Sequence, residues 1–360
     1  MKNNLLFAAI AICVLACISH ISMVRANSGS HNLSDTGNNE SNGSNEINGS
    51  NGSNGSKENG PSKPKIVAIT QIVEHPSADQ VRKGILDVLT EHGFVDGKNI
   101  IIHYENAQGN MGTAIQIANK FVSLSPDVIV PITTPSSQAV VSASKKTNIP
   151  VVFAAVTDPI NAKLVTNMKH PGGNITGTTE FPPIEQQLQL IQKIIPNVKK
   201  VGVVFSPSEI NSVKIVQLIK SAGNKQGIEI IEAPAMTSSE VPAATQSLVK
   251  NVQAIYVPLD NTVLSAMNGV LKEGFANKIP VFSSDPDSVP QGALASISYT
   301  QYEAGRLAGE MVIRIFNGEK PGSIPVSSPA KAKLTVNLES AKKLGIILPK
   351  EIIEEAIEKK

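Results

Sequence analysis

Short hydrophobic runs alternate with amphipathic stretches along most of the chain. The run 65–70 precedes a stretch, 77–92, in which apolar residues recur every three or four positions, as on one face of a helix. We expect that helix to begin with a capping box of Ser77 and Gln80. Further strands are expected, each after a helix or loop, at 100–104, 128–130 and 151–153. Such alternation predicts a parallel sheet covered by helices.

The pattern restarts with the run 200–205. The segment 127–153 has a counterpart in 253–282, because each holds a hydrophobic strand, a helix and a second strand that follows an Ile-Pro pair. We therefore expect an α/β protein with two Rossmann-like lobes of one topology. In such sheets the ligand lies beyond the carboxyl ends of the strands, so the expected site is the cleft between the two lobes.

Charge and cysteine content narrow the possible partners and chemistry. The 32 basic and 30 acidic residues are spread along the chain and give a net charge of +2, so no basic stripe indicates nucleic acid. Both cysteines, Cys13 and Cys17, lie in the first twenty residues. The folded part therefore has no disulfide, thiolate nucleophile or cysteine metal site.

The N-terminal residues have the features of an export signal, and we assign 1–26 to a signal or lipobox region. Lys2 precedes an apolar run, 5–18, that is too short to span a bilayer. The sequence Val14-Leu15-Ala16-Cys17 resembles a bacterial lipobox, in which Cys17 would carry the lipid anchor to the outer face of the membrane. A competing cleavage site ends at Ala26 and would release a soluble periplasmic protein.

The segment 27–63 is built from Asn, Ser and Gly, with a repeat at 51–56. This composition cannot bury enough apolar surface to offset the entropy of ordering, so we expect a disordered tether. A tether of this kind would let a folded domain move above a membrane.

Several motifs between residues 65 and 349 are specific enough to compare with known families. They are Ile149-Pro150-Val151-Val152-Phe153, Val156-Thr157-Asp158-Pro159, Pro171-Gly172-Gly173-Asn174-Ile175-Thr176-Gly177, Tyr256-Val257-Pro258-Leu259-Asp260-Asn261, Gly305-Arg306-Leu307-Ala308-Gly309 and Val336-Asn337-Leu338-Glu339-Ser340-Ala341. Together they resemble the substrate-binding components of ABC transporters in the tryptophan/tyrosine-binding family.

This resemblance implies a type I periplasmic-binding fold whose lobes are joined by hinge strands. The implied lobes are 64–176 plus 298–325 and 177–297 plus 326–360, with hinges near Gly177, Ile297 and Pro325. It also implies an exported protein, without a cofactor or metal, that passes a small molecule to an ABC permease in the membrane. We expect this protein to act as a monomer.

The loop after the strand 128–130 is suited to an anion such as a carboxylate. Thr134 is expected to cap the following helix, with Pro135 in its first turn and the hydroxyls of Ser136 and Ser137 beside the free backbone N–H groups. The alternative is an ordinary helix cap without a ligand.

The equivalent loop of the second lobe presents acceptors, Asp260 and Asn261. Donors on one lobe opposite an acceptor on the other would suit a zwitterion, which favours an α-amino acid over a sugar. Asp158 and Asp285 stand at matching strand ends and are alternative partners for the ammonium group. Each of these three aspartates has a second interpretation, as a cap or turn residue.

Other candidates for the cleft are weaker. Gln71 follows the first strand, and Ser206, Glu209 and Asn211 follow its counterpart in the second lobe. Phe181, near a hinge, is the first choice for contacting an aromatic ligand side chain, with Phe205 and Tyr104 behind it. These rings are at least as suited to core or hinge packing.

The sequence lacks the common catalytic motifs. It has no glycine-rich dinucleotide or phosphate loop after a strand, no nucleophile elbow and no zinc-protease motif. His75, His92, His103 and His170 occur singly, without metal-ligand spacing, and are interpreted as surface or loop residues. Catalysis is therefore not expected. A sensor domain and a sugar or nucleoside receptor of the same fold remain as alternatives.

Overall fold

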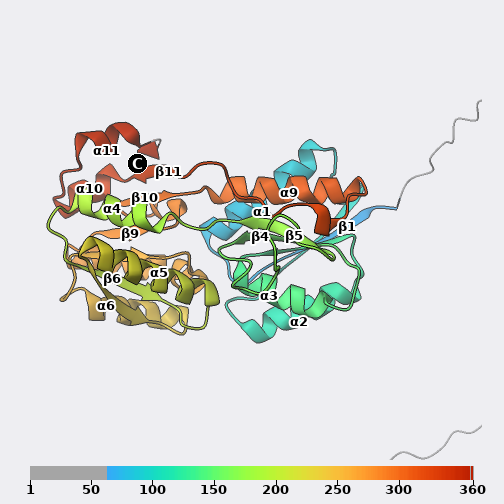
Figure 1. Cartoon of the computed structure of the whole chain (residues 1–360), viewed down its shortest axis with the longest axis horizontal. Coiled ribbons are helices and arrows are strands. Elements are labelled where there is room, and N and C mark those ends of the chain that lie inside the picture. The colour runs from blue at the N-terminus through green and yellow to red at the C-terminus, as the bar shows by residue number, and fades with distance from the viewer. Residues whose placement is uncertain (1–62, 357, 360) are drawn as a thin grey trace, which may run out of the picture. The chain divides into compact units, whose positions relative to one another are not determined.

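Two largely parallel sheets, each covered by helices on both faces, make up the described part of the chain (Figure 1). The structure is a computed structural model that describes residues 63–356 and 358–359, all within one unit spanning 59–360. The predicted signal region, Cys17 and the tether up to residue 62 lie outside the described residues. The predicted α/β class with two lobes is confirmed.

The sheet of lobe 1 has the order β2-β1-β3-β4-β5, and all its strands are parallel. Its strands are β1 (Lys65–Gln71), β2 (Ile100–Asn106), β3 (Val128–Ile132), β4 (Val151–Val156) and β5 (Ile175–Thr179). Val67 and Ile69 of β1 pack under α1 (Pro76–Glu91) and α9 (Gln301–Phe316). Ala68, which points the other way, packs under α2 (Met111–Ser123) and α3 (Thr134–Ser144).

The sheet of lobe 2 has the order β12-β11-β10-β9-β8-β6-β7, in which only β10 and β11 pair antiparallel among the described strands. Its strands are β6 (Lys200–Phe205), β7 (Glu229–Pro234), β8 (Ala254–Val257), β9 (Val281–Ser283), β10 (Ala295–Ser298), β11 (Lys333–Val336) and β12 (Glu358–Lys359). One face carries α4 (Ile184–Ile194), α5 (Ile210–Gln226), α10 (Leu338–Leu344) and α11 (Lys350–Glu355). The other carries α6 (Val241–Leu248), α7 (Asn261–Ser265) and α8 (Met267–Ala276). Single 3-10 turns are η1 (Ser238–Glu240), η2 (Pro286–Ser288) and η3 (Pro321–Ser323).

The start of α1 differs from the predicted capping box. The helix begins at Pro76, whose fixed φ suits the first helical position, and the preceding residue, His75, is the N-cap. Nδ1 of His75 accepts a hydrogen bond from the backbone N–H of Ala78 at 3.3 Å. Ser77 and Gln80 are therefore ordinary residues of the first turn.

The chain passes between the two lobes in three segments: 180–183, between β5 and α4; 299–300, between β10 and α9; and 328–332, before β11. The residues predicted as hinges lie close to these segments. Gly177 is inside β5, Ile297 is inside β10, and Pro325 precedes Ser327, which pairs with Thr178 of β5.

The return of the chain to lobe 1 depends on a close approach between α9 and α1. A Cβ atom on Gly305 would lie 2.0 Å from the carbonyl oxygen of Val81, and one on Gly84 would lie 2.4 Å from that of Tyr302. The small residues of the Gly305–Gly309 motif thus allow two helix backbones to touch. The Gly305–Gly309 motif therefore has a packing role, and the contact with α1 explains why small residues occur at these positions.

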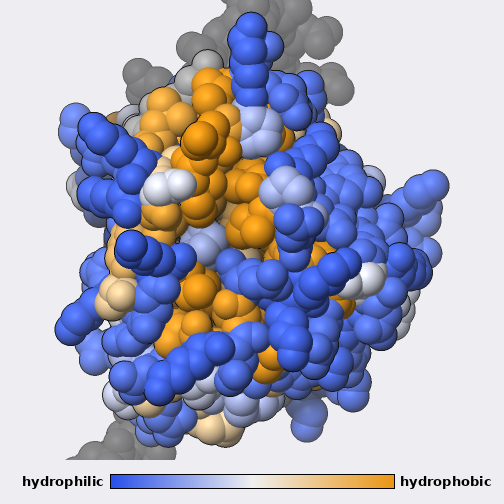
Figure 2. Space-filling view, turned by 90° about the vertical axis from the view of Figure 1, so that its left-hand side faces the viewer, coloured by the Kyte–Doolittle hydropathy of each residue, from blue (hydrophilic) through white to orange (hydrophobic). Residues whose placement is uncertain are grey.

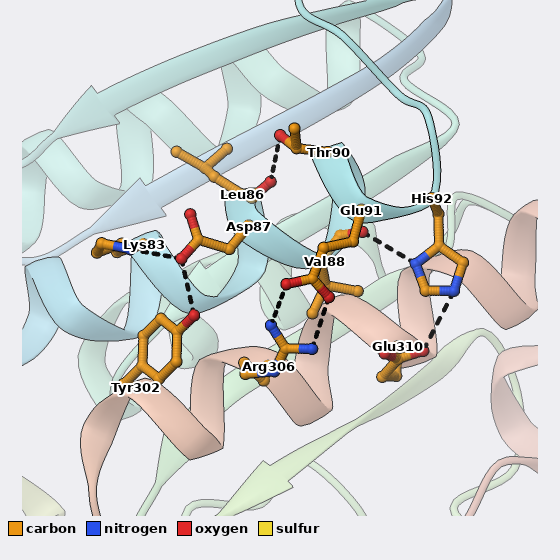
Figure 3. A network of polar contacts seen from close by, with 10 residues as sticks. All are labelled: Lys83, Leu86, Asp87, Val88, Thr90, Glu91, His92, Tyr302, Arg306 and Glu310. Atoms are coloured by element: carbon orange, nitrogen blue, oxygen red, sulfur yellow. Dashed lines mark hydrogen bonds and ion pairs between the residues drawn. The ribbon is translucent and has the colours of Figure 1, made fainter.

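Polar contacts flank this helix pair (Figure 3). Arg306 forms a two-pronged ion pair with Glu91, both N···O distances being 2.7 Å. Tyr302 donates a hydrogen bond to Asp87 at 2.8 Å, and Asp87 also pairs with Lys83. Such exposed pairs contribute little individually, so the buried apolar contact between the helices dominates their association.

Hydrophobic residues form a band on the end of lobe 2 that faces the viewer in Figure 2. The loop between α10 and α11, found at this end in Figure 1, includes Ile347, whose side chain is 92% exposed. Ile347 is not among the residues that line the pocket between the lobes.

We expect Gly305→Ala to lower the free energy of unfolding by about 1–3 kcal/mol, because the added methyl group forces α9 away from α1. Thermal or urea unfolding measures this change. The control is Gly112→Ala in α2, whose Cβ would meet one side-chain atom, Oδ1 of Asn110, at 3.1 Å. Equal stability of the two variants would contradict the assigned packing.

Candidate ligand site

A polar pocket lies between the carboxyl ends of the two sheets. It encloses about 320 Å³ of space free of atoms, including the part open to solvent. Lobe 1 contributes Thr133, Thr134 and Thr157, the first crossing segment contributes Glu180, and lobe 2 contributes Asn211, Asp260 and Asn261. Thr134 and Asp260, predicted to face one cleft, therefore do line the same pocket.

The lobe 1 side of the site is the N-terminus of α3. The helix begins at Thr134, and its N-cap is Thr133, which makes no side-chain capping bond, so the predicted cap at Thr134 is one residue off. Thr133 has a φ of 67°, a region that non-glycine residues seldom adopt. Its Oγ1 is buried without a hydrogen-bond partner, as is Oγ of Ser136. Ser137 donates its hydroxyl to the Thr133 carbonyl at 2.7 Å.

On the lobe 2 side, the carboxyl group of Asp260 finds its hydrogen-bond partners within lobe 2. Asp260 is fully buried; its Oδ1 accepts the backbone N–H of Val263 at 2.9 Å, which caps α7. Its Oδ2 accepts the N–H of Ser206 and the hydroxyl of Ser212, both at 2.5 Å. Burial, with the nearby Glu209 carboxylate, raises the pKa of Asp260 to about 8 against these hydrogen bonds. Both oxygens of Asp260 are thus occupied within its own lobe.

Glu209, a weak ligand candidate from the sequence, also holds the start of α7. Its Oε2 accepts the backbone N–H of Asn261 at 3.1 Å and the side-chain amide of Asn261 at 2.6 Å. Its Oε1 accepts the N–H and hydroxyl of Thr262 at 2.9 and 2.8 Å. The amide of Asn211 donates to Glu209 and to the Leu259 carbonyl, while Oδ1 of Asn211 is buried without a partner.

His75 was interpreted as a surface or loop residue; it does lie in the loop before α1, as the N-cap, but it is buried and not at the surface. It is 5% exposed, because lobe 2 covers it: its Nε2 lies 3.4 Å from Oδ1 of Asn261. Burial lowers its pKa in spite of nearby carboxylates. With Nδ1 accepting the bond from Ala78, the neutral ring carries its proton on Nε2 and donates it to Asn261 across the cleft.

The sequence reasoning overlooked Glu180. It follows β5 directly, is 4% exposed and lines the pocket, and its Oε2 is buried without a hydrogen-bond partner. Burial raises its pKa well above the ordinary range, although a hydrogen bond from Gln301 opposes this. No helix or strand pattern marks a residue in a crossing segment, so the sequence held no signal for it.

The other predicted residues lie outside the described pocket lining. Ser206 is tied to Asp260, as described above. Gln71 is buried and donates to Asp79 at 3.1 Å; Asp158 is half-buried and caps a turn by accepting the N–H of Asn161 at 3.0 Å. Asp285 is buried and accepts the Ser288 hydroxyl at 2.7 Å, and Phe181 is 41% exposed. Of the two aromatic residues ranked after Phe181, Phe205 lies in the hydrophobic core and Tyr104 is exposed.

Ten of the fourteen described lining residues carry a hydroxyl, amide, carboxyl or imidazole group, and the other four are Ala or Leu, a mixture that suits a small organic molecule with polar and apolar parts. Residues 63–356 and 358–359 contain no cluster of three or more His, Cys, Asp or Glu side chains able to hold a metal ion. Within the same residues no helix has both the length and the apolar character needed to cross a membrane.

Comparison with known proteins identifies related sequences and structures. Residues 66–360 match the family described as ABC transporter substrate binding protein. A curated relative, the tyrosine-binding protein of Clostridioides difficile (strain R20291), is 40% identical over 284 residues, which cover 79% of this chain and 82% of that protein.

Two solved structures add a comparison of conformations. The ABC domain in complex with L-Trp from Streptococcus pneumonia is 34% identical, with a TM-score of 0.79, over 83% of this chain and 100% of that one. A substrate-binding protein with adhesive properties from Clostridium difficile, in a ligand-free, open structure, is 38% identical, with a TM-score of 0.62, over 82% and 98%. The present chain thus superposes better on the liganded relative than on the open one, although the open one is closer in sequence.

We expect Asp260→Ala to destabilise the ligand-free protein by about 2–4 kcal/mol, because it leaves the buried donors of Ser206, Ser212 and Val263 unpaired. Thermal unfolding without ligand measures this. Asp158→Ala, which loses one half-buried turn contact, serves as the control and should cost about 1 kcal/mol or less. A variant of Asp260 with normal stability and lost ligand binding would instead support the direct ligand contact predicted from the sequence.

Proposed function

Because the chain belongs to the family of ABC transporter substrate-binding proteins, we propose that it captures an aromatic L-amino acid outside the cytoplasm and presents it to an ABC permease. The family consists of solute-binding proteins and not of enzymes. The observation that carries the proposal is the pocket between the lobes, in which the hydroxyl of Thr133, the amide oxygen of Asn211 and one carboxyl oxygen of Glu180 are buried without a partner. The names of two relatives, one for tyrosine and one for L-Trp, support the ligand class.

The ligand's carboxylate is proposed to lie at the N-terminus of α3. Unbonded N–H groups of the first turn and the positive end of the helix dipole attract an anion there. The unpaired Oγ1 of Thr133 lines the pocket beside this turn and can donate a further hydrogen bond. This keeps the interpretation of the Thr-Pro-Ser-Ser loop and moves its main hydroxyl from Thr134 to Thr133.

The ligand's side chain is proposed to pack against the apolar part of the lining. Leu259 and Leu264 of lobe 2 and Ala78 and Ala155 of lobe 1 supply this surface. Phe181 stays a candidate for contact with the ring, since it lies in the first crossing segment and is partly exposed.

Closure of the lobes is proposed to enclose the ligand, with the three crossing segments as hinges. Contacts across the cleft support this: His75 meets Asn261, and Ile210 of lobe 2 packs against the hydrophobic cluster of lobe 1 that includes Ile72. The better superposition on the L-Trp complex than on the open relative agrees with a closed arrangement.

The proposal includes the cellular setting. We propose that Cys17 carries a lipid that anchors a monomer to the outer face of a bacterial membrane, with 27–63 as the tether. Cleavage after Ala26, which would release a soluble periplasmic protein, is the alternative. Mass spectrometry of the membrane fraction distinguishes a lipidated Cys17 from a chain that begins at Asn27.

We expect L-tyrosine or L-tryptophan to raise the melting temperature of the purified protein, whereas sugars and nucleosides should not. At a ligand concentration of 100 Kd the gain in stability is about 2.7 kcal/mol. Thr133→Val removes the donating hydroxyl and should raise Kd about tenfold in calorimetric titration.

The matched control is Ser144→Ala, at the other end of α3, which should leave Kd unchanged. A screen in which only sugars stabilise the protein would refute an amino acid as the ligand.

A further inference from the structure

Glu180 is a buried carboxyl group without a positive partner among the described residues. Its recorded hydrogen-bond partner is the neutral side chain of Gln301, and its Oε2 has none. Burial raises the pKa of Glu180 most, and the carboxylates of Asp285 and Asp287 from lobe 2 raise it further by repulsion. The surroundings of Glu180 are therefore unfavourable for its ionised form.

Among the residues that the structure describes, the pocket lining supplies no cation at this position. The described pocket lining contains no Lys or Arg, and its other titratable groups are His75 and Asp260. Burial keeps His75 neutral, and the oxygens of Asp260 accept bonds from lobe 2. An ionised Glu180 in the closed cleft can thus be compensated only by a charge that enters with the ligand.

We propose that Glu180 binds the ammonium group of the ligand and makes closure of the two lobes conditional on that group. The inference rests on the proposed function, which it extends from ligand class to a mechanism of discrimination. Glu180 belongs to the first crossing segment, so the carboxyl group that would bind the ligand lies in one of the proposed hinges.

The condition follows from the cost of burying an unpaired charge. When the cleft is open, water solvates the ionised Glu180, and closing the empty cleft would strip that water away without replacement. An ammonium group replaces the water, because an opposite charge stabilises the carboxylate inside the pocket. A deaminated analogue brings a carboxylate and no cation, so the cleft should stay open around it.

Acid should weaken this selection. Only the ionised carboxyl attracts an ammonium group, so ligand binding lowers the pKa of Glu180 relative to the empty cleft. The affinity for the amino acid is therefore highest at a pH above the pKa that Glu180 has without ligand. It falls as the pH drops through that value, because Glu180 is then protonated. His75, Asp260, Asp285 and Asp287 also lie nearby, so the part of the pH dependence that Glu180→Gln removes is the part assigned to Glu180.

The first experiment compares the full exported protein with its Glu180→Gln and Glu185→Gln variants by calorimetric titration. Glu185 is an exposed residue of α4 and serves as the matched control. The probes are L-tyrosine, L-tryptophan and their deaminated analogues, 3-(4-hydroxyphenyl)propionate and indole-3-propionate. For the wild type and the control we expect the amino acid to bind at least about a hundredfold more tightly than its analogue, and for Glu180→Gln this ratio should fall below about tenfold.

The second experiment needs no ligand. Small-angle X-ray scattering should give Glu180→Gln a smaller radius of gyration than the ligand-free wild type, because the neutral amide no longer opposes closure. An unchanged radius, or an unchanged ratio of affinities, would overturn the role of Glu180. If neither amino acid binds the wild type, the proposed function fails, and the scattering result alone decides on Glu180.

Discussion

The structure depends on one constraint: polar groups buried where two lobes meet must find partners. The carboxyl groups of lobe 2 meet it internally, because Asp260 and Glu209 accept hydrogen bonds from the start of α7 and from the residue after β6, whereas Oδ1 of Asn211 stays unpaired. Lobe 1 and the first crossing segment leave atoms of Thr133, Ser136 and Glu180 unpaired. The carboxyl groups of lobe 2 are thus held by hydrogen bonds within that lobe, whereas Glu180 and the hydroxyls opposite them have atoms free to bond to a ligand.

This difference between the two walls of the pocket distinguishes residues that hold the pocket in shape from residues that are proposed to bind the ligand. Asp260 looks like a ligand group when only its position after a strand is known. Its three hydrogen bonds show a residue that fixes the loop of lobe 2, so that Asn261 can reach His75 across the cleft. In the proposed function, recognition of the ligand is left to the N-terminus of α3 in lobe 1 and to Glu180 in the first crossing segment.

The sequence predicts the fold well, because hydrophobic runs and helical periodicity are local, and the repeat between 127–153 and 253–282 indicates two similar lobes. It also located Thr134, Asp260 and Asn261 at one pocket, since loops after parallel strands share one edge. It could not assign the state of Asp260, whose donors Ser206 and Ser212 are 54 and 48 residues away in the chain. The burial of His75 and Glu180 likewise depends on parts of the chain far away in sequence, such as Asn261 beside His75 and Gln301 beside Glu180, which no local pattern records.

The crossing segments also bear on how the molecule is made. The core of lobe 1 includes Ala304, Ala308 and Val312 of α9, which the chain reaches only after most of lobe 2. Lobe 1 therefore cannot complete its core before α9 has left the ribosome or any channel through which the chain passes. Because α9 comes so late in the sequence, lobe 1 stays incompletely folded until α9 follows. A chain that is not yet folded can still pass through a narrow channel.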